Sequence, residues 1–265
     1  MIDYHIHTRL CNHARGSMEA YIKKGIQEGL KEICFLDHLT IQDEGKGLSM
    51  LPSEVPLYFQ ALQYFKNSYN GLIDIKAGLE VDFNPVHAQL FEDIINTYAF
   101  DLITGSLHFP GGIDIVSRSS AWSKGQQDND YIYSLYFKHL EEMLGYDYFD
   151  VIGHIDLIKK FGKKPLKLYD KEINKILSII KKKCLVVEVN TSGYNHPAGE
   201  AYPCSKLLKK CNRAGIGITL GSDAHKPEQV GQYFDRALSM LISAGYTEIT
   251  TFTKRLPKKI SINIS

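Results

Sequence analysis

Two histidines near the start of the chain, His5 and His7, have the spacing of a metal-binding pair. Successive side chains of an extended strand point to opposite faces, so both imidazoles share one face while Ile6 points to the other. Two neighbouring neutral imidazoles can share one ion, and imidazole is a ligand for zinc, iron and nickel. In a chain with ten histidines, this pair indicates a metal site only if other segments supply matching ligands.

Matching ligands follow several apolar runs farther along the chain. Each run reads as a buried strand and ends in side chains that offer a nitrogen or oxygen ligand. These terminal residues are Asp37 with His38, Glu80, His108, His154, Asn190, and Asp223 with His225. Any one of them could be an ordinary core histidine, a helix cap or a salt-bridge partner. Their repeated position at the end of an apolar run favours one shared site.

These side chains require a framework of alternating strands and helices. Strands are predicted over residues 2–7, 32–36, 73–81, 100–108, 148–154, 185–190 and 216–220. Helices are predicted over residues 18–30, 53–69, 85–96, 131–145 and 171–182, in a segment that ends near 214, and over 227–245. Ser17 is the expected N-cap of the first helix. Residues 248–253 form either an eighth strand or an irregular tail.

This alternation has no linker and no charge block to divide it, so we expect one domain over residues 1–265. Its fold class is α/β, and its predicted architecture is a single parallel barrel surrounded by helices. In such a barrel the functional residues lie where the strands end, at the carboxyl face. The candidate ligand residues would therefore meet at one place.

The connection over residues 109–130 is rich in glycine, serine and polar residues and lacks an apolar period. It is longer than an ordinary connection, which predicts a functional loop over the site. Arg118 in this loop offers a planar guanidinium suited to phosphate. The alternative is an ordinary exposed arginine, in which case Arg9 and Arg15 are the next candidates.

The composition is that of a globular protein with a full core, because 44% of the residues are hydrophobic and 23% are charged. The 31 lysines and arginines nearly cancel the 30 acidic residues. No global positive field exists to hold a nucleic acid, although a small anionic substrate remains compatible. No apolar run approaches the roughly 20 residues that span a bilayer, and the N-terminus begins directly with a strand. We expect a cytosolic protein without a membrane partner and of undetermined oligomeric state.

The five cysteines are odd in number and include no Cys-x-x-Cys pair. This usage favours reduced thiols over a disulfide framework or a thiolate zinc site. Cys11 lies near two candidate ligands and is a minor candidate itself. His196, in an Asn-His-Pro segment, has no assigned role.

Several of these segments together resemble the PHP (polymerase and histidinol phosphatase) superfamily. The motifs that carry the resemblance are His5-Ile6-His7-Thr8, His13, Asp37-His38, Glu80, Gly105-Ser106-Leu107-His108, Gly153-His154 and Gly221-Ser222-Asp223-Ala224-His225. Two further stretches are similar more narrowly to its monofunctional histidinol-phosphate phosphatases, namely Glu188-Val189-Asn190-Thr191-Ser192-Gly193 and Gly199-Glu200-Ala201-Tyr202-Pro203. The resemblance runs from residue 2 to about residue 237.

The resemblance implies a distorted, TIM-like (β/α)7 barrel with three divalent transition metals per chain. Carried over motif by motif, the first metal would be held by His5, His7, Glu80 and Asp223, the second by Glu80, His108 and His154, and the third by His13, His38 and His225. Glu80 has two oxygens and can bridge two ions. The ligands are all nitrogen or oxygen, so zinc, manganese and iron remain open.

The activity that the resemblance implies is a metal-dependent phosphomonoesterase, in particular a histidinol-phosphate phosphatase of histidine biosynthesis, acting on a small phosphate ester. A water that bridges two divalent ions has its pKa lowered towards neutrality and supplies a hydroxide to attack phosphorus. Glu80 and Asp223 would hold the ions for this chemistry. Asp37 or a metal-bound water would protonate the leaving group, and Asn190 would contact the substrate or cap its loop.

Two alternatives stay open at this point. One is a related phosphoesterase that acts on nucleotides or on another small phosphate ester. The other is a PHP module that binds metal but serves in structure or interaction without catalysis. The near-complete set of nine candidate ligands argues against the second alternative.

Overall fold

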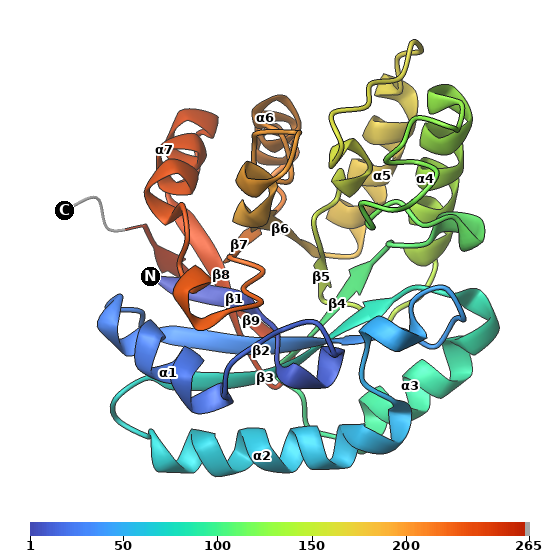
Figure 1. Ribbon diagram of the computed structural model, residues 1–265. Coiled ribbons are helices and arrows are strands. Elements are labelled where there is room, and N and C mark those ends of the chain that lie inside the picture. The colour runs from blue at the N-terminus through green and yellow to red at the C-terminus, as the bar shows by residue number, and fades with distance from the viewer. Residues whose placement is uncertain (263–265) are drawn as a thin grey trace.

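Seven strands lie side by side in one parallel sheet that curves into a nearly closed barrel (Figure 1). The structure is a computed structural model that describes residues 1–262. The strands follow the chain order around the barrel. They are β1 Ile2–Ile6, β2 Glu32–Leu39, β3 Asp74–Asp82, β4 Leu102–Ser106, β5 Val151–Ile152, β6 Val186–Asn190 and β7 Ile218–Gly221. The (β/α)7 barrel expected from the resemblance is confirmed.

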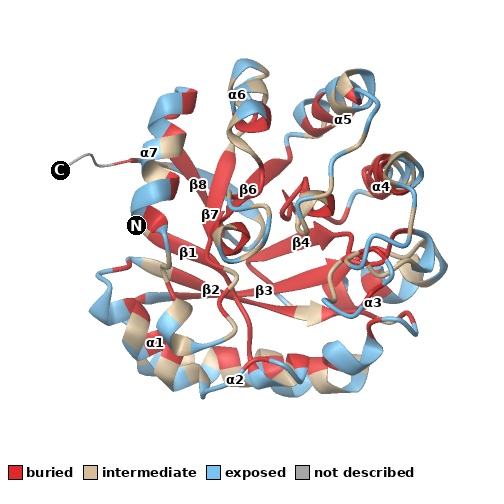
Figure 2. Ribbon diagram, turned by 45° about the horizontal axis from the view of Figure 1, so that its top comes forward, coloured by how far each residue is buried: buried red, intermediate tan, exposed pale blue. Residues whose placement is uncertain are grey.

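Helices surround the barrel and turn their buried sides toward the strands (Figure 2). They are α1 Met18–Gln27, α2 Val55–Ser68, α3 Ala88–Thr97, α4 Asn129–Met143, α5 Asp170–Lys182, α6 Ser205–Arg213 and α7 Phe234–Ala244. In α5, for example, Ile176, Leu177 and Ile180 are buried, and this spacing places them on one helix face. No helix within residues 1–262 is both long and apolar enough to cross a membrane.

The register of the sheet brings candidate ligands from neighbouring strands together. β2 and β3 pair over eight residues, and this pairing sets His38 beside Glu80. β2 extends to Leu39, so His38 lies inside the strand rather than just after it. Asn190 of β6 pairs with Gly221 of β7, which places the start of the Gly-Ser-Asp-Ala-His motif beside the Glu-Val-Asn motif.

The first and last barrel strands meet through a single parallel bridge between Ile6 and Ala224. The His7 amide donates to the Ala224 carbonyl at 3.0 Å, and the Ala224 amide donates to the His5 carbonyl at 3.2 Å. These two hydrogen bonds close the barrel next to the His-x-His pair.

Two predicted helix features have different outcomes. Ser17 caps α1, because its side chain accepts a hydrogen bond from the Ala20 amide. The single helix expected over residues 227–245 is wrong, since a short 3-10 turn at Pro227–Gln229 is separated from α7. Between them Gly231 and Tyr233 have φ values of 71° and 59°, which a right-handed helix cannot contain. The Gly231 amide instead donates to Asp3.

The segment expected as an eighth strand or a tail forms a hairpin outside the barrel sheet. β8, Glu248–Thr253, pairs antiparallel with β9, Leu256–Ser261. The hairpin covers the amino ends of the barrel strands. There the Phe252 amide donates to the Tyr4 hydroxyl at 3.1 Å, and the Arg255 guanidinium reaches Asp150 at 2.8 Å. The antiparallel pairing explains why these residues do not extend the parallel barrel.

Candidate metal centre

Glu80, near the end of β3, is the centre of a cluster of imidazoles. Its Oε1 lies 2.8 Å from His154 Nε2 and 3.6 Å from His108 Nε2. Its Oε2 lies 2.8 Å from His38 Nδ1 and 3.3 Å from His5 Nε2. Glu80 is 1% exposed, so imidazoles from four parts of the barrel surround one desolvated carboxylate. Its two oxygens face different imidazoles, which is the arrangement needed to bridge two ions.

His5 and His7 lie on one face of the first strand, with ring centroids 4.9 Å apart. The shared face predicted from the strand period is therefore confirmed. Asp223, which follows β7, approaches both rings from across the barrel closure. Its Oδ1 lies 3.0 Å from His7 Nε2 and 3.9 Å from His5 Nε2.

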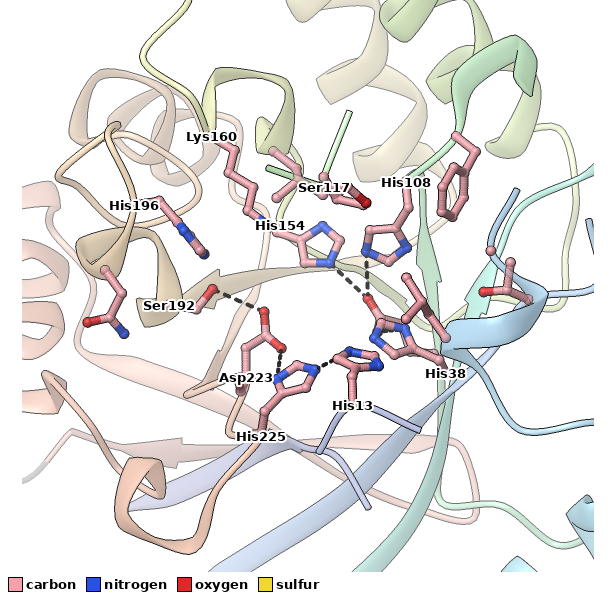
Figure 3. Close-up of a pocket in the computed structure, with 18 of the residues that line it drawn as sticks. His13, His38, His108, Ser117, His154, Lys160, Ser192, His196, Asp223 and His225 are labelled. Carbon is pink, nitrogen blue, oxygen red and sulfur yellow. Dashed lines mark hydrogen bonds and ion pairs between the residues drawn. The ribbon is translucent and has the colours of Figure 1, made fainter. Parts of the chain in front are cut away.

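At the mouth of the site, His13 and His225 face each other (Figure 3), and their Nε2 atoms are 2.8 Å apart. The Nδ1 atom of His13 lies 2.7 Å from the Cys11 carbonyl oxygen, and that of His225 lies 3.0 Å from the Asp223 carbonyl oxygen. A carbonyl oxygen only accepts, so each Nδ1 carries the proton and both Nε2 lone pairs point at one another. Two lone pairs at this distance repel unless a cation or a proton lies between them.

Among the five groups of side chains whose ligand atoms lie within 4.8 Å of one another, three overlapping groups consist only of the nine candidate ligands. The groups are His5 with His7 and Glu80; His38 with Glu80 and His108; and His7 with His38 and His225. His38 belongs to two groups, whereas the family resemblance assigns it to the third metal alone. The division of the nine ligands among three ions therefore stays a prediction.

Some buried polar atoms of the cluster lack a hydrogen-bond partner in the described part of the chain, which also fits a metal site. Within residues 1–262, His5 Nε2 and Glu80 Oε2 have no hydrogen-bond partner, because His38 Nδ1, although 2.8 Å from Oε2, is not aligned to donate to it. Leaving a buried polar atom unpaired costs about 1–3 kcal/mol, which a bound ion would offset. Cys11 lies in reach of His13 and His225, but burial raises the pKa of its thiol to about 12. The nine candidate ligands offer only nitrogen and oxygen, which suits zinc, manganese or iron.

Burial and mutual charge leave part of the cluster in the protonation states that bind metal. Burial alone would lower the pKa values of His5, His7 and His108, but the neighbouring carboxylates outweigh it and raise them, so a metal would displace a proton from these three rings. Burial lowers the pKa of His13, brings the pKa of His38 to about 3, and holds the pKa of His225 well below its ordinary value. These three rings are neutral at physiological pH. Burial alone would raise the pKa values of Glu80 and Asp223, but the neighbouring imidazoles outweigh it and hold both well below their usual range. Ionised carboxylates and neutral imidazoles are the protonation states that bind metal.

Glu188 of β6 supports the cluster from behind, and sequence reasoning missed it. Its Oε1 lies 2.5 Å from His5 Nδ1, and its Oε2 accepts from the His154 amide at 2.8 Å. Such a carboxylate fixes the orientation and tautomer of a ligating imidazole. The signal was present, because Glu188 lies two residues before Asn190 in an otherwise apolar strand and so shares its face.

Asp82 stands behind His108 in a similar way and was also missed. It accepts from the His108 amide at 2.9 Å, and its Oδ1 lies 3.6 Å from His108 Nδ1. The Gln42 side chain donates to its other oxygen at 2.9 Å. Asp82 lies two residues after Glu80, so the strand period that selects Glu80 selects it as well.

Asp37 does not reach the cavity, which corrects the prediction that it protonates a leaving group. It is 0% exposed. Its Oδ2 accepts from the Thr8 amide at 3.1 Å and from the Thr8 hydroxyl, and its Oδ1 lies 3.4 Å from His7 Nδ1. Because Asp37 contacts the opposite side of the His7 ring from Asp223, it positions a candidate ligand instead of donating a proton.

Asn190 caps the segment that follows β6, which was one of the two roles expected for it. Its Oδ1 accepts from the Ser192 amide at 3.0 Å and from the Ser192 hydroxyl at 2.7 Å. Its Nδ2 lies 3.3 Å from Asp223 Oδ2 and 3.3 Å from Glu188 Oε1. Asn190 is 0% exposed and does not line the cavity, so the predicted substrate contact is corrected to support of Asp223.

A cavity of about 360 Å³ opens over the ligand cluster. Figure 3 shows Lys160, Ser117 and His196 around it, with Lys160 and Ser117 beside His154. Arg118 is exposed and does not line the cavity. It directly follows Ser117, which lines the cavity, and its charge adds to burial, the main cause, in lowering the pKa of Lys160. Burial, together with the charge of Lys160, also lowers the pKa of His196 to about 4, so this ring faces the cavity as a neutral group.

Comparison with known proteins agrees with this geometry. The PHP domain model matches residues 3–192. The chain is 31% identical to the probable histidinol-phosphatase of Deinococcus radiodurans over 94% of this chain and 96% of that protein. It is 28% identical to the probable histidinol-phosphatase of Schizosaccharomyces pombe over 96% of this chain and 90% of that protein.

A solved structure has the same fold. The histidinol phosphate phosphatase of Lactococcus lactis, crystallised with zinc, L-histidinol and phosphate, superposes with a TM-score of 0.82 at 23% identity, covering 97% of this chain and 98% of that chain. The match to the family model spans most of the chain, and a relative above 30% identity extends along nearly all of it, so the chain belongs to the PHP domain family.

Proposed function

We propose that the protein is a metal-dependent phosphomonoesterase that hydrolyses histidinol phosphate to histidinol and phosphate. The convergence of unpaired nitrogen and oxygen ligands around Glu80 carries this proposal, and the histidinol-phosphatase relatives support its substrate. Nine residues would hold divalent transition ions, three per chain, of zinc, manganese or iron: His5, His7, His13, His38, Glu80, His108, His154, Asp223 and His225. When bound, such ions lower the pKa of water and neutralise charge on the phosphate.

Lys160, which sequence reasoning missed, is the proposed phosphate anchor. Its side chain lines the cavity beside His154 (Figure 3). Burial lowers the pKa of its ammonium group, which means that desolvation disfavours the charged form. A phosphate dianion would compensate that desolvation with charge-assisted hydrogen bonds. Arg118 would add a second, more exposed cation.

The remainder of the cavity wall suits an amino alcohol with an imidazole ring. Asn195, Gln229 and Gln232 line it and carry amide groups that donate and accept hydrogen bonds. Their orientations are fixed, because Asn195 donates to Gln232 at 3.0 Å and accepts from the Tyr233 hydroxyl at 2.7 Å. Leu48, Phe109, Val116 and Leu157 line the same cavity, so the wall offers amides to the polar groups of a substrate and apolar side chains to its ring.

Initial rates on a panel of phosphate esters test the proposal. Metal-loaded protein should hydrolyse histidinol phosphate with a kcat/KM at least about 100-fold above the values for serine phosphate, glycerol phosphate and AMP. A higher kcat/KM for AMP would identify a nucleotide phosphoesterase. Absence of turnover on every ester by fully metallated protein would indicate a non-catalytic module. The single domain and the cytosolic location stay predictions.

A further inference from the structure

A second cavity lies outside the metal centre, between α4, α5 and α6. Its volume is about 490 Å³, larger than the cavity over the ligand cluster. Apolar side chains from the three helices form part of its wall: Tyr133, Phe137, Ile173 and Leu207. None of the nine proposed metal ligands lines it. This surface would accept the apolar body of a small molecule.

The rim of this cavity is positively charged. Lys159 and Lys210 are neutralised, the first by Asp156 and Glu200 and the second by Asp170. Three further lysines line the cavity without an ion pair to any residue in the range 1–262: Lys163, Lys164 and Lys206. The lining contains five lysines and three carboxylates, so its excess of two positive charges attracts an anion.

The second cavity also contains an acceptor that lacks a donor. Asp156 lines the cavity and is 9% exposed. Its Oδ2 accepts from the Cys204 amide at 2.9 Å and pairs with Lys159 at 3.0 Å. Its Oδ1 is buried and has no hydrogen-bond partner in the part of the chain that the structure describes. Because this oxygen is shielded from solvent, the carboxylate must shift before an N–H or O–H group of a ligand can satisfy it.

Only one thickness of backbone separates this cavity from the metal centre. Along the segment that contains the 3-10 turn Leu157–Lys159, Leu157 and Lys160 line the metal-site cavity, whereas Ile158 and Lys159 line the second cavity. The same division occurs between His196 and the next residue, Pro197. A molecule that displaces this wall would therefore move Lys160.

We propose that the second cavity binds a small amphipathic anion, namely a molecule with a ring-sized apolar body, one carboxylate or phosphate group and one hydrogen-bond donor. Its apolar body packs against the helices, its anion meets the free lysines and its donor reaches Asp156. Binding shifts the wall that carries Lys160 and changes the KM of the phosphatase site. The site itself does not depend on the proposed substrate, because binding is measured without turnover.

Four related probes separate the recognition elements by calorimetry. Indole-3-acetate carries all three elements, benzofuran-3-acetate lacks the N–H, indole-3-acetamide lacks the charge and tryptamine reverses it. We expect saturable, one-to-one binding of indole-3-acetate, about tenfold weaker binding of benzofuran-3-acetate, and the weakest binding of tryptamine. Equal affinities for all four probes, or no saturable binding of indole-3-acetate, would overturn the proposal.

Charge reversal locates the bound probe. In the double variant Lys163→Glu and Lys206→Glu, the affinity for indole-3-acetate should fall at least tenfold. The control variant Lys182→Glu and Lys209→Glu makes the same change of net charge at exposed lysines that do not line the cavity, and its affinity should equal that of the parent. Equal losses in both variants would mean that the probe senses only net charge. Complete displacement by inorganic phosphate would place the probe at the metal centre, contrary to the proposal.

The coupling to the metal centre has its own measurement. At saturating indole-3-acetate, the KM of the parent protein for its phosphate ester should change at least twofold, and the probe should have no such effect on the Lys163→Glu and Lys206→Glu variant. By linkage, inorganic phosphate should change the affinity of the probe by the same factor as the probe changes the affinity of phosphate. An unchanged KM with the probe bound would disprove the coupling.

Discussion

Both ends of the barrel bury charged residues, but the two ends differ in how many hydrogen-bond partners the chain supplies to them. At the amino end Asp101 accepts from the Ala77 amide at 3.0 Å and from the Lys254 amide at 3.0 Å. Asp150 accepts from the Ile103 amide at 2.8 Å and pairs with Arg255 at 2.8 Å. At the carboxyl end, atoms of the central carboxylate and of the imidazoles around it lack hydrogen-bond partners within residues 1–262.

This difference separates stability from function. Where all partners of a buried carboxylate belong to the chain, their hydrogen bonds and ion pairs offset its desolvation in the folded protein. Removal of that carboxylate leaves the partners unpaired and lowers stability. In the ligand cluster, the desolvation of the unpaired atoms is offset only when a metal ion binds. Stability should therefore depend on the amino end of the barrel, while activity should depend on the carboxyl end.

Removal of metal is expected to have the largest effect on activity, and it tests most directly whether the carboxyl end of the barrel carries the function. Chelation should abolish hydrolysis, and manganese, zinc or iron should restore it. The melting temperature should also fall on chelation, because ions that bind only the folded state stabilise it by mass action. Metal analysis, activity and thermal unfolding on the same samples measure all three effects. Full activity in a preparation without transition metal would contradict the metal centre.

Glu80→Gln should come next, because it keeps the size of the side chain and removes the charge that faces four imidazoles. We expect a fall in kcat of about 1000-fold or more and the loss of at least one metal equivalent. The far-ultraviolet circular dichroism spectrum should match that of the parent. Near-normal turnover with full metal content would refute the bridging role of Glu80.

Asp150→Ala applies the same test to the amino end. It leaves the Ile103 amide and the partly exposed Arg255 guanidinium without their acceptor, so unfolding free energy should fall by about 2–3 kcal/mol. Denaturant unfolding measures this change. Metal content and kcat at 25 °C should equal those of the parent protein. A loss of bound metal in this variant would show that the two ends are not independent.

Substitution of Lys160 or Arg118 should have the smallest effect on activity, and it compares two cations at the carboxyl end of the barrel. Lys160→Met keeps much of the side-chain volume and should raise KM by roughly tenfold to hundredfold, since it removes charge-assisted contacts. Arg118→Ala should raise KM less, because Arg118 is exposed and screened. Steady-state kinetics and phosphate inhibition compare the two variants, and metal content should match the parent in both. A larger effect at Arg118 would mean that the loop closes over the substrate.

The strand and helix alternation predicted the barrel, and the polar ends of the strands predicted which residues converge. The prediction for Asp37 conflicted with the same strand period that it relied on. Neighbours in a strand point to opposite faces, so Asp37 and His38 cannot both face the site. His38 lines the cavity, and Asp37 lies behind His7. Asp82 and Glu188 were accessible by the same reasoning, from their two-residue spacing to Glu80 and Asn190.

Other features had no comparable signal in the sequence. Lys160 belongs to an irregular segment after the shortest strand, β5, where no period fixes the direction of a side chain. The β8–β9 hairpin has an exposed second strand with two lysines and a proline, so it lacks the apolar alternation of a buried strand. Tertiary contacts, such as that of Arg255 with Asp150, define both features.

The closure of the barrel between its first and last strands also sets the order of events as the chain is made. His7 and Asp223, which approach one another at that closure, are 216 residues apart. At a synthesis rate of roughly 5–20 residues per second, the histidines at the N-terminus wait about 10–40 s for the aspartate to be added. A chain that stops before Asp223 contains the first two imidazoles and Glu80 but not the whole ligand set. Completion of the metal centre is therefore among the last steps in the biogenesis of this protein.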